Sequence, residues 1–291
     1  MEKGEKGAAL TAALLQQAHG KVDEALLECL PTNDRKAIAI CLSISSTPSN
    51  FLARRNQTIT AIDTSWFALL LKQWPQSLHP VVLGCLPKKK AKELTKQEGL
   101  SIKPSQLAPI AKAYFTSLIF SPMLSGYSPP VEVLSQGKFA ILLKAGKKAL
   151  VKIVEFLAMN DVAQEMKKVV DKEVWQKLST IIQGAKEDFF RLCMQRKSKL
   201  SLEPLNLKKW QGDNDALVEQ LLERGFQRLG IALSQEHPSF LWKISRTLDQ
   251  ATGEKLLNYS SHAKSYAKKP GLIDTAGKDL LFVVNWMEQG G

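Results

Sequence analysis

Residues 217–257 constrain the fold more than any other stretch, because they contain two helices with a sharply punctuated joint. Ser234 fits the N-cap of the second helix, and Pro238 fits its first turn, where a missing N–H costs nothing. Leu248-Asp249 then starts a turn into a third, short helix that ends near Leu257. Apolar side chains recur at helical spacing in the first two helices: Leu217, Leu221, Leu222, Phe226, Leu229 and Leu233, then Phe240, Leu241, Ile244 and Leu248. A single helix pair cannot bury such faces alone, so the pattern predicts a stacked-helix repeat.

The rest of the chain has the same character. No segment shows sustained two-residue alternation between turn signals, so we predict an all-α fold without a sheet. The prolines that cluster between residues 99 and 135 indicate a boundary. We therefore expect an N-terminal helical lobe at 1–98, a Pro-rich connector with one helix at 99–135, and a C-terminal helical lobe at 136–291. The expected architecture is a stack of short helices in two lobes, similar to armadillo and HEAT repeats.

Several further helices are expected from the apolar spacing. Asn160-Asp161 is interpreted as the start of a helix that runs through Met166 and Val170. His79-Pro80 aligns with His237-Pro238, which suggests an internal duplication, although helix–proline punctuation is common in any helical protein. The other predicted helices cover residues 8–30, 35–44, 107–120, 137–157, 174–194 and 272–287.

The chain is basic. It has 291 residues, with 40 Lys plus Arg against 28 Asp plus Glu, and a formal net charge of +12. Such a balance favours an acidic partner, which could be nucleic acid, an anionic membrane surface or an acidic protein surface. Nucleic-acid binding usually adds arginine, aromatic stacking positions or a recognisable module, whereas lysine dominates here. A protein partner is therefore favoured over nucleic acid.

The usual sequence patterns of catalysis and metal binding are missing. No His-Glu-x-x-His, Walker-type or dinucleotide-binding pattern occurs, and the four histidines lie far apart. The four cysteines, Cys29, Cys41, Cys85 and Cys193, have no zinc-type spacing and are expected to be buried thiols in a reduced, cytoplasmic setting. We expect a non-enzymatic protein without metal or cofactor. No uninterrupted run of about 20 apolar residues is present to span a membrane.

One short motif resembles a known family. Glu236-His237-Pro238, followed by Leu248-Asp249 and by residues 253–257, resembles the signature repeat of the flagellar motor-switch protein FliG. The chain departs from that pattern at Ser239, at Gln250 and at Thr252-Gly253, where the family has glutamine, proline and two alanines.

The resemblance implies a cytoplasmic scaffold or adaptor of a bacterial membrane-embedded machine, peripheral to the inner membrane. Its implied partners are a ring-forming switch or secretion protein and the cytoplasmic tail of a membrane ring protein. The ring-facing site would be Glu236, His237, Pro238 and Ser239. The family's carboxy-terminal torque helix has no match here, so a type III secretion adaptor is favoured over a flagellar switch.

Trp242 and Arg246 extend this candidate surface. At about 100° per residue, Trp242 projects from nearly the opposite side of its helix to the core stripe, with Arg246 near it. Tryptophan and arginine most often anchor protein interfaces. The alternative is that another helix of the same lobe covers Trp242.

Two other functions stay open. One is a basic helical-repeat protein that binds nucleic acid through its lysine faces. The other is a regulatory helical domain like those on magnesium transporters, against which the lack of a transmembrane segment counts.

Overall fold

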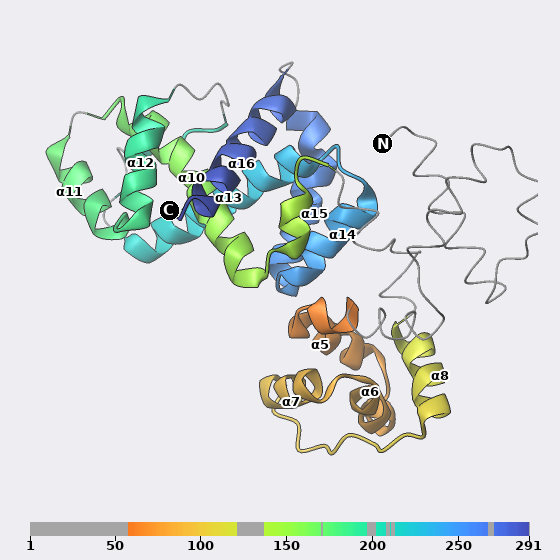
Figure 1. Ribbon diagram of the computed structural model, residues 1–291. Helices are drawn as coiled ribbons and strands as arrows, with labels where there is room; N and C mark the ends of the chain where they lie inside the picture. The colour runs from red at the N-terminus through yellow and green to blue at the C-terminus, as the bar shows by residue number, and fades with distance from the viewer. Residues whose placement is uncertain are drawn as a thin grey trace, which may run out of the picture. The chain divides into compact units, whose positions relative to one another are not determined.

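The computed structural model describes residues 58–120, 137–169, 171–196, 202–207, 210, 213–266 and 271–290 (Figure 1). Within these ranges every regular element is a helix and no strand occurs, so the all-α prediction is confirmed there. The chain divides into two compact units, residues 1–140 and 141–291. The helices predicted at 8–30 and 35–44 lie outside the described residues, and the lobe boundaries at 98 and 135 stay predictions.

The described part of the first unit is a small helical cluster. Phe67 and Phe120 meet edge to face in its core, with ring centroids 5.6 Å apart. Gly84 allows close packing, because a Cβ there would lie 2.4 Å from the Ser105 carbonyl oxygen. The elements are α5 (Thr64–Gln73), η1 (Gln76–Leu78), α6 (His79–Cys85), α7 (Lys88–Gln97) and α8 (Pro109–Phe120), of which α8 packs on α6.

Several helices end on C-cap residues with extended backbone. Trp74 and Leu86 are extended C-caps, each followed by a proline, and the residue before proline avoids the helical region. In the second unit Leu248 takes the same extended C-cap conformation without a proline after it. Leu86 and Leu248 are both buried, so each joint anchors the chain in its own core.

The second unit contains longer helices. Its elements are η2 (Ala140–Lys144) at the junction of the two units, then α10 (Lys147–Met166), α11 (Lys172–Ile181), α12 (Ala185–Gln195), α13 (Asn214–Leu233), α14 (Pro238–Thr247), α15 (Gln250–Tyr266) and α16 (Leu272–Glu288). The predictions of α13 and α16 are confirmed. α15 continues well beyond Leu257, where the short third helix was predicted to end.

The predicted helix boundaries between residues 137 and 195 are wrong in two places. α10 begins only at Lys147 and then runs unbroken through Asn160 and Asp161, which were interpreted as a helix start. The Asn160 side chain donates to the Leu157 carbonyl and the Asp161 carboxylate accepts from Arg228, so neither side chain caps a helix start. The apolar residues 174–194 lie on two helices, α11 and α12, which are separated at Gly184, whose φ of 60° breaks the helix.

α13 lies at the centre of the second unit and packs against α10, α15 and α16 (Figure 1). A Cβ at Gly225 would lie 2.1 Å from the Val154 carbonyl oxygen of α10, and one at Gly230 would lie 2.6 Å from Cβ of Tyr259 in α15. Every residue from 228 to 233 is buried, so the single apolar face predicted for α13 is too narrow. The two glycines let α10 and α15 approach the helix from different sides.

Candidate partner-binding surface

The start of α14 carries the residues singled out by the Glu-His-Pro motif. His237 is the N-cap, and its Nδ1 accepts a hydrogen bond from the Ser239 N–H at 3.2 Å. Pro238 occupies the first turn, as predicted. The N-cap predicted at Ser234 is wrong, because Ser234 caps the end of α13 and donates its hydroxyl to the Ile231 carbonyl at 2.8 Å. His237 and Pro238 are exposed, while Glu236 and Ser239 are half-buried.

Trp242 and Arg246 lie next to each other one turn apart on α14. The Arg246 guanidinium carbon lies 5.8 Å from the centroid of the Trp242 ring, within cation–π range. Both residues are half-buried, so Trp242 is neither a core residue nor fully outward. The indole Nε1 is shielded from water and has no acceptor among the described residues. Burial lowers the pKa of Arg246, and the nearby charge of Glu254 raises it. The effect of burial is larger, so the pKa is lowered overall.

The joint after α14 is fixed by Asp249. Its Oδ1 accepts a hydrogen bond from the Thr252 N–H at 3.0 Å, which is the bond of an N-cap at the start of α15. Lys147, the first residue of α10, lies 3.5 Å from the other carboxylate oxygen. Burial alone would raise the pKa of Asp249, but the hydrogen bonds from Thr252 and the charge of Lys147 lower it overall. The turn predicted at Leu248-Asp249 is therefore present and stabilised by a charge.

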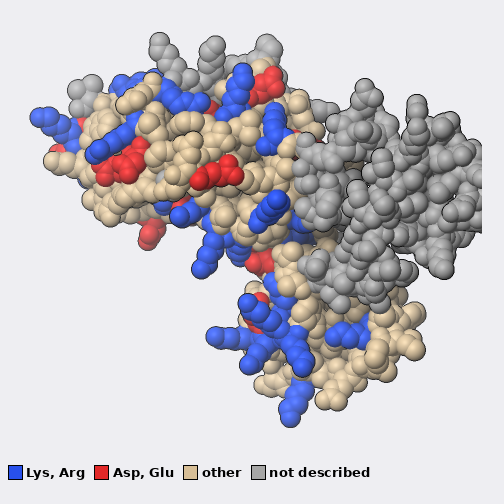
Figure 2. All heavy atoms as spheres, viewed as in Figure 1, with Lys and Arg blue, Asp and Glu red and all other residues tan. Residues whose placement is uncertain are grey.

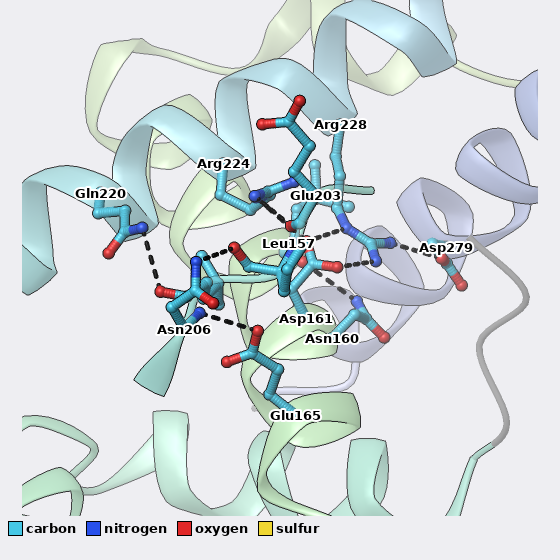
Figure 3. A network of polar contacts seen from close by, with 12 residues as sticks. Leu157, Asn160, Asp161, Glu165, Glu203, Asn206, Gln220, Arg224, Arg228 and Asp279 are labelled. Atoms are coloured by element: carbon cyan, nitrogen blue, oxygen red, sulfur yellow. Dashed lines mark hydrogen bonds and ion pairs between the residues drawn. The ribbon is translucent and has the colours of Figure 1, made fainter. Parts of the chain in front are cut away.

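A buried ionic network joins three helices of the second unit (Figure 3). Arg228 of α13, 1% exposed, bonds Asp161 of α10 in bidentate geometry, with both N···O distances 2.7 Å. Its third nitrogen donates to Asp279 of α16 at 2.8 Å. Arg224 and Arg196 approach the two aspartates more loosely, at 3.9 Å and 3.8 Å. The network therefore holds α10, α13 and α16 at fixed orientations around one guanidinium.

Arg228 stays charged at every accessible pH. Burial lowers its pKa, but the hydrogen bonds and charges of Asp161 and Asp279 outweigh that effect and raise it. Sequence reasoning missed this site, since its partners lie 67 and 51 residues away. The available signal was a pair of arginines four residues apart, Arg224 and Arg228, within the apolar half of α13.

An irregular segment, residues 202–207, is held against the same helices by side chains (Figure 3). The two carboxylate oxygens of Glu165 accept hydrogen bonds from the backbone N–H groups of Asn206 and Leu207, both at 3.0 Å. Gln220 and Arg224 of α13 donate to the carbonyls of Leu205 and Glu203. The polar groups of α10 and α13 thus serve packing, although Nη1 of Arg224 is buried without a hydrogen-bond partner among the described residues.

The described residues form no metal site. No cluster of three His, Cys, Asp or Glu that could hold a metal ion occurs among them. Cys85 and Cys193 are buried free thiols, as predicted, and burial raises the pKa of Cys193 to about 12. Cys29 and Cys41 lie outside the described ranges. In the part of the chain that the structure covers, no helix is long and apolar enough to cross a membrane.

Comparison with known proteins found no matching family model, no matching curated protein and no matching solved structure.

Proposed function

We propose that this chain is a non-catalytic adaptor whose second unit binds a partner protein through α14. Trp242 carries the proposal, because part of its indole stays exposed on the surface beside the Arg246 guanidinium. Tryptophan and arginine are also the side chains that most often dominate binding energy. The exposed His237 and Pro238 extend this surface to the start of the helix.

The arrangement of helices supports an adaptor. α6 with α7, and α14 with α15, are helix pairs whose first member ends on a buried, extended leucine. Repetition of such pairs is typical of stacked-helix proteins of the armadillo and HEAT kind, which bind other polypeptides along their surfaces. The duplication marked by His79-Pro80 and His237-Pro238 stays a hypothesis, since buried His79 contacts the Trp74 carbonyl while exposed His237 caps a helix.

The identity of the machine rests on the resemblance of residues 236–257 to the motor-switch repeat. On that basis we place the chain at the cytoplasmic face of a bacterial inner membrane, in a type III secretion apparatus in preference to a flagellar rotor. It would link a membrane ring protein to a cytoplasmic ring protein. Glu236, His237, Pro238 and Ser239, with Trp242 and Arg246, would face the cytoplasmic ring.

The test is the affinity of the purified full chain for the ring-forming secretion or switch protein of its source organism. Trp242→Ala should weaken binding by more than about 1 kcal/mol while the far-UV circular dichroism stays that of the wild type. Trp175→Ala is the matched control, because Trp175 is also half-buried but lies on α11, where its indole donates to the Val169 carbonyl. Binding should survive that change.

Equal losses in Trp242→Ala and Trp175→Ala would contradict the proposed surface, as would undiminished binding of a folded Trp242→Ala protein. If Trp242→Ala unfolds, Arg246→Gln replaces it, with the exposed Arg191→Gln as control. Loss of binding confined to Arg246→Gln would support the surface, and equal binding by both would reject it.

A further inference from the structure

The strongest unassigned surface is the outward face of α7 in the first unit. Lys89, Lys92 and Lys96 are exposed there, at spacings of three and four residues. At 1.5 Å rise per residue, their Cα atoms span about 10 Å along one side of the helix. The view in Figure 2 shows Lys and Arg side chains gathered over this part of the first unit.

These lysines surround a shallow hollow of about 460 Å³. Glu93, Thr95 and Leu100 complete its lining, so the methylene stems of the lysines and the Leu100 side chain give it apolar walls. The hollow therefore presents an apolar floor with ammonium groups at its rim. Such a surface suits a ligand that is both apolar and acidic.

Acidic neighbours offset only part of the positive charge of Lys89, Lys92 and Lys96. Glu93, the acidic residue within the row, accepts a hydrogen bond from the Thr64 hydroxyl at 2.9 Å, and Glu98 pairs with Lys72 at 3.8 Å. Residues 58–120 hold eight lysines and three acidic residues. The positive potential of this face thus extends beyond α7 itself.

We propose that the α7 face, defined by Lys89, Lys92, Lys96 and Leu100, binds an acidic amphipathic helix of a partner protein. A helix that carries Glu or Asp at positions i, i+3 and i+7 repeats the spacing of the three lysines. An apolar side chain between those acids would enter the hollow. This surface is separate from α14 and gives the adaptor a second binding site.

Two other classes of partner fit the face less well. A flat anionic bilayer would contact the rim of the hollow but leave its apolar floor empty, and Glu93 lies within the lysine row. Nucleic acid would call for aromatic stacking or arginine forks, and the lining of the hollow contains neither.

The experiment uses the full chain and a fluorescein-labelled 18-residue helical peptide with Glu at i, i+3 and i+7 around Leu. Its control peptide has Gln in place of each Glu. Fluorescence anisotropy at low salt should show binding of the Glu peptide about tenfold tighter than that of the Gln peptide. Lys89→Gln/Lys92→Gln/Lys96→Gln should weaken binding of the Glu peptide about tenfold, because the row then carries no positive charge.

The matched control is Lys144→Gln/Lys148→Gln/Lys152→Gln, which removes the same charge from exposed lysines at the start of the second unit. It should change the affinity by less than about threefold, since these lysines do not line the hollow. Equal losses in the two triple variants, or none in either, would overturn the proposal. So would α7-dependent binding of phosphatidylserine vesicles or of a 20-nucleotide poly(U) RNA in the absence of peptide binding.

Discussion

Arg228→Met should destabilise the second unit strongly, because Asp161 and Asp279 then lose the cation that bonds both of them. Breaking a buried ion pair by removing one partner typically costs about 3–5 kcal/mol, since the remaining charge stays buried without compensation. Methionine keeps an unbranched stem of similar length, so loss of packing contributes little.

The expected magnitude lies at the lower end of that range. Arg224 lies 3.9 Å from Asp161, and Arg196 lies 3.8 Å from Asp279, so each aspartate keeps one weaker cationic neighbour. We therefore expect a loss of about 3 kcal/mol in the free energy of unfolding, a change of about 100-fold in the unfolding equilibrium.

The assay is urea denaturation combined with native-state hydrogen exchange. Amides of α13 should exchange about 100-fold faster in Arg228→Met, whereas amides of α6 and α7 in the first unit should not change. Arg191→Met is the control, because Arg191 pairs with Glu187 on the surface of α12 and its side chain is 70% exposed. Loss of such a surface pair should cost less than about 0.5 kcal/mol.

A second substitution separates the network from simple loss of packing. Asp279→Leu should cost less in the Arg228→Met background than in the wild type, because the first change has already removed its strongest bond. Strictly additive losses, or a cost of Arg228→Met no larger than that of Arg191→Met, would refute the reasoning.

Three further predictions concern the stability and the thiol reactivity of the second unit. Gly225→Ala should lower the free energy of unfolding by about 1–3 kcal/mol despite the better helix propensity of alanine, because the new Cβ would lie 2.1 Å from the Val154 carbonyl oxygen. A variant that is more stable than the wild type in thermal denaturation would contradict this. The lowered pKa of Asp249 means that its charge stabilises the fold above the ordinary pKa of 3.8 and ceases to do so as the pH falls below that value. The stability difference between wild type and Asp249→Asn should therefore shrink towards pH 2.5, and a difference independent of pH would reject the argument. Since burial raises the pKa of the Cys193 thiol to about 12, iodoacetamide at pH 8 should label this thiol only after unfolding. Rapid labelling of Cys193 in the native protein, located by peptide mapping, would disprove this.

Local sequence signals predicted α13, α14 and α16 well, because helical spacing and proline positions act over a few residues. α13, α14 and α16 lie where the apolar pattern puts them. The N-cap was misplaced at Ser234 because histidine is an uncommon cap, although His237 directly precedes the proline.

The features that could not be predicted from the sequence depend on contacts between residues far apart in the chain. Asp161 was interpreted as a helix start because aspartate favours caps, but its carboxylate is bound to Arg228, 67 residues away. The central position of α13 likewise depends on Gly225 and Gly230, whose close neighbours come from α10 and α15. The half-burial of Trp242 could not be predicted either, since helical periodicity fixes the direction of a side chain without showing what lies beside it.

Hydrogen exchange of the complex with the ring-forming protein tests the proposed function most directly. Binding should slow exchange of the amides at residues 236–247, which include the start of α14 and the turn that carries Trp242 and Arg246. Amides of α11, on another part of the same unit, should exchange as in the free chain. Protection confined to α11 and α12, with α14 unchanged, would contradict the central claim.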